Sequence, residues 1–130
     1  MYFEQPLEKI LIGNEELPVK IDMFVLEKIQ GMYGNLNEFE LKIKGLKLTD
    51  DKKYERVEPD IGAMNFVLPL MVREGCEIEG IELELTDMDI VRGVKCSYIE
   101  LGKLITKEFD KCFESEKKEK PSKQIKKQNR

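Results

Sequence analysis

The side chains best suited to chemistry are either missing from this chain or lack the spacing that a site needs. The 130 residues include no His, the commonest general base and the commonest metal ligand in proteins. They include 26 Asp and Glu, so chance pairs of carboxylates are expected throughout. Asp50, Asp51 and Asp60 come closest to a metal cluster, but they lack the alternating ligands, the Gly and the final Glu of an EF-hand. The sequence therefore predicts no metal site.

The cysteines do not form a site either. Cys76, Cys96 and Cys112 are odd in number and widely spaced, with no CxxC pair and no His to complete a zinc site. No Ser or Cys has a candidate base nearby other than Lys, and no Gly-rich phosphate-binding loop is present. We therefore expect reduced thiols, no cofactor and no catalytic residue. The chain is predicted not to be an enzyme.

The net charge of −4 hides an asymmetry along the chain. Residues 117–130 contain six Lys and one Arg against one Glu, whereas residues 1–116 contain 15 basic and 25 acidic side chains. A basic tail could bind nucleic acid, or it could be a solubilising tail that folds back on the body. Since the acidic body would repel phosphate, nucleic-acid binding is the less favoured of the two.

No segment approaches the length of a membrane span, and the first residues do not show a basic region followed by an apolar run. An odd number of cysteines without a signal peptide is typical of a reducing compartment. We therefore expect a cytoplasmic chain that does not bind a membrane.

The elements that must position any functional surface begin with a β-hairpin and two helices. Gly13-Asn14 suits a tight turn, Asp22 and Asn35 suit helix N-caps, and Gly34 suits a helix end. These signals predict strands at 10–12 and 17–21 and a helical hairpin over 22–46. Pro18 cannot donate a ladder hydrogen bond, which places its strand at a sheet edge or a bulge.

The rest of the chain is predicted to be mostly helical. Its predicted elements are a short strand at 54–57, an apolar helix from Pro59 to Gly75, an alternating edge strand or loop at 76–86, a helix from Thr86 to Gly93 and a last helix from Ser97 to about Phe113. The resulting fold class is α+β: a mostly helical single domain over 1–114, with an N-terminal β-hairpin and four to five helices. Residues 115–130 are predicted to be a disordered or frayed basic tail.

The chain has more apolar and Met side chains than its predicted core needs. On the first helix, the apolar stripe is wider than one neighbour can cover, so this helix is either central to the core or partly exposed as a docking face. That stripe consists of Met23, Val25, Leu26, Ile29, Met32 and Tyr33. Candidate partner-binding residues, chosen because they lie off the main stripes, are Phe24, Met32, Phe66 and Leu70.

Five stretches of the chain share a recognisable layout: IGNEELPVKID, VLEKIQGMYG, NLNEFELKIKGL, Pro59-x-x-x-Ala63-Met64-Asn65 and Leu68-Pro69-Leu70-Met71-x-x-Glu74-Gly75. Together these stretches resemble the tail assembly chaperones of long-tailed bacteriophages and prophages of Gram-positive bacteria. The resemblance is one of overall layout, and it includes no catalytic or ligand-binding motif.

The resemblance implies a non-enzymatic chaperone that coats the helical tape-measure protein and leaves as tail tube subunits arrive. Its partners would be the tape-measure protein and the tail tube protein, and self-association stays open. Two other classes are also open: a head–tail connector or tail terminator that forms a ring, and a small nucleic-acid-binding regulator that uses the basic tail.

Overall fold

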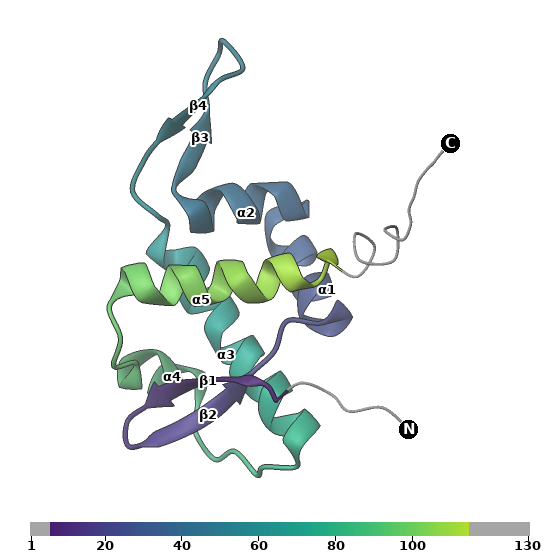
Figure 1. The fold of residues 1–130 in the computed structure, drawn as a ribbon, viewed down its shortest axis with the longest axis vertical. Helices are drawn as coiled ribbons and strands as arrows, with labels where there is room; N and C mark the ends of the chain where they lie inside the picture. Colours follow the sequence, from purple (N-terminus) through teal and green to yellow (C-terminus); the bar gives the residue numbers. More distant parts are fainter. Residues whose placement is uncertain (1–5, 115–130) are drawn as a thin grey trace.

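A long helix, α3 (Ile61–Glu79), runs through the middle of the computed structural model, and the other helices and one strand of the N-terminal hairpin pack against it (Figure 1). The structure describes residues 6–114. In chain order, the other elements are β1 (Glu8–Ile12), β2 (Glu15–Val19), α1 (Met23–Tyr33), α2 (Leu36–Lys44), β3 (Leu46–Leu48), β4 (Tyr54–Arg56), α4 (Asp87–Gly93) and α5 (Tyr98–Lys111). Within the described range, these elements form one α+β domain with five helices and an N-terminal β-hairpin, which confirms the predicted fold class. The tail predicted to be disordered, 115–130, lies outside the described residues.

The N-terminal hairpin, β1–β2, lies against α3. Its strands pair antiparallel around a turn in which Gly13 has a φ of 61°, a region that suits glycine. The inward side chains of Ile10, Leu17 and Val19 are buried. Beyond the last strand residue, the Lys20 amide donates to the Met71 carbonyl of α3 at 3.1 Å. The inner face of the hairpin is therefore part of the core. A lone two-stranded hairpin is only marginally stable in water, and this packing against α3 stabilises it.

The predicted helical hairpin is confirmed, together with the signals that limit its helices. Asp22 accepts from the Val25 amide at 3.2 Å, and Asn35 accepts from the Glu38 amide at 2.8 Å. The second helix ends at Gly45, so the last predicted residue, Leu46, begins β3 instead.

The prediction for α3 was wrong at its C-terminal end. The helix continues past Gly75 to Glu79 and ends at Gly80, which has a φ of 72°. Gly75 is an interior residue that allows β2 to approach, because an added Cβ would collide with the Pro18 backbone. A glycine required for close packing has the same sequence signature as one that ends a helix.

The alternating segment 76–86 is therefore helical in its first part, and residues 81–86 form a loop, the second of the two predicted forms. Arg73 holds this loop against α3: its guanidinium donates to the Leu85 carbonyl at 3.1 Å and to the Asp87 carboxylate at 2.6 Å. The loop is thus held by a side chain instead of by strand pairing.

A second hairpin, β3–β4, projects from the body as an arm (Figure 1). The strand at Tyr54–Arg56 confirms the predicted strand at 54–57, but its partner strand Leu46–Leu48 was not predicted. The base of the arm is held where the Val57 amide donates to the Gly45 carbonyl at 2.9 Å.

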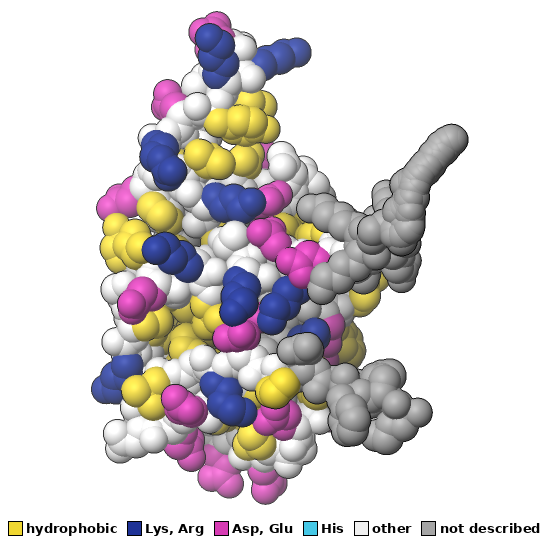
Figure 2. All heavy atoms as spheres, in the orientation of Figure 1, with side chains coloured by type: hydrophobic (Ala, Val, Ile, Leu, Met, Phe, Trp, Pro, Cys, Tyr) yellow, Lys and Arg dark blue, Asp and Glu magenta, His cyan; other side chains and the backbone are white. Residues whose placement is uncertain are grey.

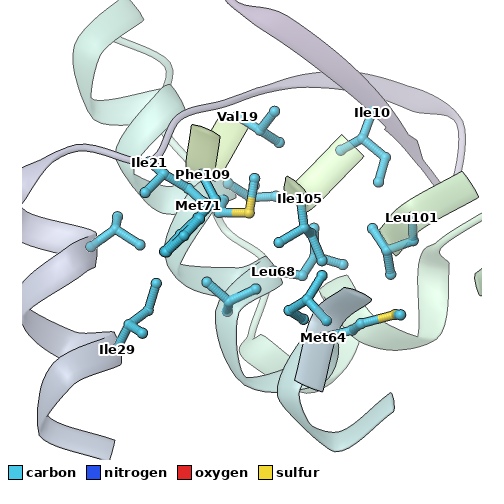
Figure 3. Close-up of a cluster of buried hydrophobic side chains, with 14 of the residues drawn as sticks. Ile10, Val19, Ile21, Ile29, Met64, Leu68, Met71, Leu101, Ile105 and Phe109 are labelled. Atoms are coloured by element: carbon cyan, nitrogen blue, oxygen red, sulfur yellow. The ribbon is translucent and has the colours of Figure 1, made fainter. Parts of the chain in front are cut away.

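Helices α4 and α5 begin after Thr86 and Ser97, as predicted, and in the structure both of these residues form capping boxes. The buried face of α5 joins α3 and the N-terminal hairpin in one apolar core (Figure 3). The labelled side chains in that view are Ile10, Val19, Ile21, Ile29, Met64, Leu68, Met71, Leu101, Ile105 and Phe109. This single core fixes the positions of α1 and α5, on which the exposed apolar surfaces lie.

Candidate partner-binding surface

Helix α1 buries one side and exposes large apolar side chains on the other. Val25, Leu26 and Ile29 are buried, as the width of a helical face allows. By contrast, Met23 is 80 % exposed, Phe24 65 % and Met32 56 %. Of the two predicted roles for this helix, partial exposure is the one observed, because the neighbouring helices cover only part of its stripe.

A shallow hollow of about 370 Å³ lies between α1 and α3. Its lining includes Met32, Phe66 and Leu70, three of the four predicted partner-binding residues. Phe66 and Leu70 are half-buried and are one turn apart on α3, so they form one wall of the hollow. Lys28 and Gly31 of α1 complete the lining, and the absence of a side chain at Gly31 leaves the hollow open.

The fourth predicted residue, Phe24, lies in a separate hollow of about 830 Å³ between α1 and the end of α5. Met23, Leu36 and Phe113 share this hollow with it. Sequence reasoning did not select Met23 or Phe113 as binding residues. Met23 directly follows the Asp22 cap, and a residue in the first turn of a helix has few neighbours to cover it. This position in the sequence could have indicated that Met23 is exposed.

A chain of aromatic contacts runs beneath the surface from one hollow to the other. Phe66 contacts Tyr33, Tyr33 contacts Phe39, Phe39 contacts Phe109 and Phe109 contacts Phe113, with ring centroids 5.3–5.8 Å apart. These separations are in the range of favourable aromatic pairs. These contacts therefore connect Phe66 of one hollow to Phe113 of the other. We call the exposed apolar side chains of α1 and the two hollows beside it the α1 surface.

Asp22, the N-cap of α1, interacts with Glu74 of α3. A hydrogen bond with Asp22, reinforced by burial and by the charges of Asp22 and Glu77, raises the pKa of Glu74 to about 7 from its usual 4.5. Glu74 therefore holds a proton near neutral pH and can donate to the carboxylate that caps α1.

The nearby thiols do not make this surface reactive. Cys112 is half-buried, and its Sγ donates to the Ile21 carbonyl at 3.3 Å. Burial raises the pKa of Cys112, and the same cause raises the pKa of Cys76. A thiol with a raised pKa is a poor nucleophile at neutral pH. Cys112 therefore acts as a packing residue beside Phe113.

Within residues 6–114, no group of three or more His, Cys, Asp or Glu side chains is arranged to hold a metal ion. None of the helices in this part of the chain combines the length and apolar character needed to cross a membrane. Comparison with known protein families, curated proteins and solved structures finds no match to this chain. The α1 surface is an exposed apolar face with two hollows beside it.

Proposed function

We propose that the protein is a non-enzymatic tail assembly chaperone, which binds a tape-measure protein in the host cytoplasm and helps to recruit tail tube subunits to it. The observation that carries the proposal is the exposure of Met23, Phe24 and Met32 on one helix of a small domain that already has a complete core. Large exposed apolar patches mark interaction sites in soluble proteins. We infer the tape-measure protein as the partner from the resemblance of the first part of the chain to tail assembly chaperones.

The shape of the α1 surface suits an amphipathic helix as its ligand. Phe24 and Met32 are separated by two turns, or roughly 12 Å along α1, which matches the spacing of anchors on a partner helix. Hollows of about 830 Å³ and 370 Å³ lie beside these two side chains and could receive apolar groups of the partner. Unbranched Met side chains can adapt to the irregular sequence of a long helical partner. A tape-measure helix coated by many copies would thereby be kept from aggregating.

The test is co-expression of the full chain with a tape-measure fragment, followed by co-purification and light scattering during size exclusion. The informative variant is Met32→Glu, and its matched control is Met88→Glu. Met88 lies on α4 and is 58 % exposed, so the control adds the same charge at a site of equal exposure away from the α1 surface. We expect many copies of the wild-type chain per fragment, loss of the complex with Met32→Glu and retention with Met88→Glu.

Three outcomes would contradict the proposal. An insoluble fragment alongside a chain that elutes as a ring of fixed size would favour a connector or terminator. Salt-sensitive DNA binding that is lost on removal of 117–130 would favour a nucleic-acid-binding regulator. Equal loss of the complex in both variants would show that binding does not use the α1 surface.

A further inference from the structure

Another hollow, of about 550 Å³, lies away from the α1 surface, between the base of the β3–β4 arm and the first turns of α5. Its apolar lining includes Ile43, Leu46 and Met64, and Ile43 and Met64 belong to the core. Tyr98 and Ile99, at the start of α5, line its other side and are 39 % and 45 % exposed. We call this hollow the arm groove.

The arm extends the arm groove outward. Leu46 pairs with Arg56 and Leu48 pairs with Tyr54, and residues two apart on a strand share a face. Because Leu46 and Arg56 line the arm groove, Leu48 and Tyr54 lie on the same face of the arm, farther from the body. These two side chains are 50 % and 58 % exposed. In Figure 2, hydrophobic side chains follow the arm down toward α5, with Lys and Arg side chains between them.

The charged side chains that line the arm groove are all positive. Lys44, Arg56, Lys103 and Lys107 line it, and no acidic side chain does. This is a local reversal, because residues 1–116 contain ten more acidic than basic side chains. Lys44 pairs with Glu40 at 2.7 Å, and Lys107 pairs with Glu8 at 2.8 Å.

The other two cations are available to a ligand. Within residues 6–114, neither Arg56 nor Lys103 has a carboxylate within 4.0 Å. Both side chains belong to exposed residues. They stand on opposite sides of the arm groove, Arg56 on the arm and Lys103 on α5. A ligand with acidic groups on two sides of an apolar stripe would match this arrangement.

We propose that the arm groove is a second docking site, which binds an acidic amphipathic segment of a partner protein. Apolar side chains of that segment contact Leu48, Tyr54 and Ile99, and its carboxylates pair with Arg56 and Lys103. Such complementarity sets which partner is accepted and raises the association rate. The site is independent of the α1 surface, so the chain would bind two partners or two parts of one.

Two other occupants fit the arm groove less well. Nucleic acid would meet only two unpaired cations on a predominantly acidic body. A second copy would have to offer its own acidic segment at 78–85, but there Leu83 and Leu85 pack against the core and Arg73 holds the Leu85 carbonyl. That segment therefore cannot present a continuous apolar stripe.

The test uses the full chain and two synthetic peptides in fluorescence anisotropy. The probe peptide is an amphipathic helix of about 15 residues with Leu at i, i+3, i+4 and i+7 and Glu elsewhere. Its twin has Lys in place of every Glu. We expect the Glu peptide to bind, its affinity to fall as salt is raised, and the Lys peptide to bind at least about tenfold more weakly.

Two variants place the binding site. Lys103→Glu should lower the affinity for the Glu peptide by about tenfold, because it reverses one of the two unpaired charges. Leu48→Ser should lower the affinity for the Glu peptide by a similar factor, because apolar contact is lost. The control, Arg92→Glu, makes the same change of charge at an exposed residue on α4 and should leave affinity within about twofold. Thermal unfolding of each variant checks that all remain folded.

Several results would overturn the proposal. These are an absence of binding by the Glu peptide, equal binding of the Lys peptide, and equal weakening by Lys103→Glu and Arg92→Glu. Displacement of the peptide by a single-stranded oligonucleotide would assign the arm groove to nucleic acid. Concentration-dependent self-association in sedimentation, abolished by Lys103→Glu, would assign it to a second copy. All of these results are independent of whether a tape-measure fragment binds the α1 surface.

Discussion

The two β-hairpins share antiparallel pairing but differ in what covers them. In β1–β2, the inward faces of Ile10, Leu17 and Val19 are buried against α3. The β3–β4 arm has an equivalent face with Leu48 and Tyr54, but both are at least half exposed. The difference shows that an apolar strand face need not belong to the core. When no element of the fold covers it, the face stays exposed to solvent.

The attachment of the two hairpins differs in the same way. Besides contacting α3, β1–β2 is joined to the end of α4, where the Gly13 amide donates to the Gly93 carbonyl at 2.8 Å. The arm is held at its base, where the Val57 and Asp60 amides donate to the Gly45 and Lys42 carbonyls, each at 2.9 Å. Substitutions in β1–β2 should therefore change stability, whereas substitutions on the arm should change binding.

The largest effect is expected at the contact between β1–β2 and α3. A Gly75→Ala substitution places a Cβ into the Pro18 backbone, so the hairpin must move away from the helix. We expect the free energy of unfolding to fall by about 3 kcal/mol or more, measured by urea denaturation.

Gly31→Ala is the matched control for this substitution. Gly31 is also an interior helical glycine, but nothing lies within 4 Å of its added Cβ. The free energy of unfolding of this variant should rise by about 0.5–1 kcal/mol, since Ala is the better helix former. Equal effects at Gly31 and Gly75 would contradict the assigned role of Gly75.

The next comparison uses the same substitution in each hairpin. Leu17→Ala removes a side chain that is 4 % exposed in β2, and should destabilise by about 2–4 kcal/mol. Leu48→Ala removes a side chain that is 50 % exposed in β3, and should lower the free energy of unfolding by less than about 0.5 kcal/mol. Both values come from urea denaturation at one pH. A large loss of stability with Leu48→Ala would show that the arm belongs to the folding core.

A pH-dependent effect is expected at Glu74, beside the Asp22 cap that follows β1–β2. Because its pKa is raised from 4.5 to about 7, the folded chain binds more protons than the unfolded chain between these pH values. This group therefore makes stability fall as pH rises from 4.5 to about 7. Glu74→Gln should remove that slope and raise stability at pH 8 by about 1 kcal/mol, with little change at pH 4.

The control for this prediction is Glu84→Gln, which removes the same charge from an exposed residue in the 81–86 loop. Its thermal unfolding profile across pH should follow that of the wild type. If Glu74→Gln also follows the wild-type profile, the pairing with Asp22 does not hold Glu74 protonated.

Local signals in the sequence predicted the fold where the structure depends on local chemistry. Asp22, Asn35, Thr86 and Ser97 cap helices because each side chain bonds an amide within its own first turn. The N-terminal hairpin followed from its turn residues. These features need no knowledge of distant neighbours.

The errors arose where distant contacts decide the structure. Gly75 is required for the close approach of Pro18, which lies far from it in sequence, and this contact cannot be seen in the local pattern. The strand at Leu46–Leu48 depends on its pairing with Tyr54–Arg56 across a loop. Which of the Met side chains are exposed depends on where neighbouring helices stop.

The candidate surface was only partly predictable for this reason. Met32, Phe66 and Leu70 do lie together, while Phe24 belongs to the neighbouring hollow with Met23. Their role in binding stays a prediction. The arm groove was not predicted at all, because it combines α5 with a strand pair that the sequence did not reveal.

The most direct test of the α1 surface is the rate of methionine oxidation by dilute peroxide, followed by mass spectrometry, with and without the tape-measure fragment. Met23, Met32 and Met88 are exposed in the free chain and should oxidise readily, while Met64 and Met71 are fully buried. In the complex, we predict slower oxidation of Met23 and Met32 and an unchanged rate at Met88. Unchanged rates at Met23 and Met32 in a complex that has formed, or protection at Met88 instead, would contradict docking on the α1 surface.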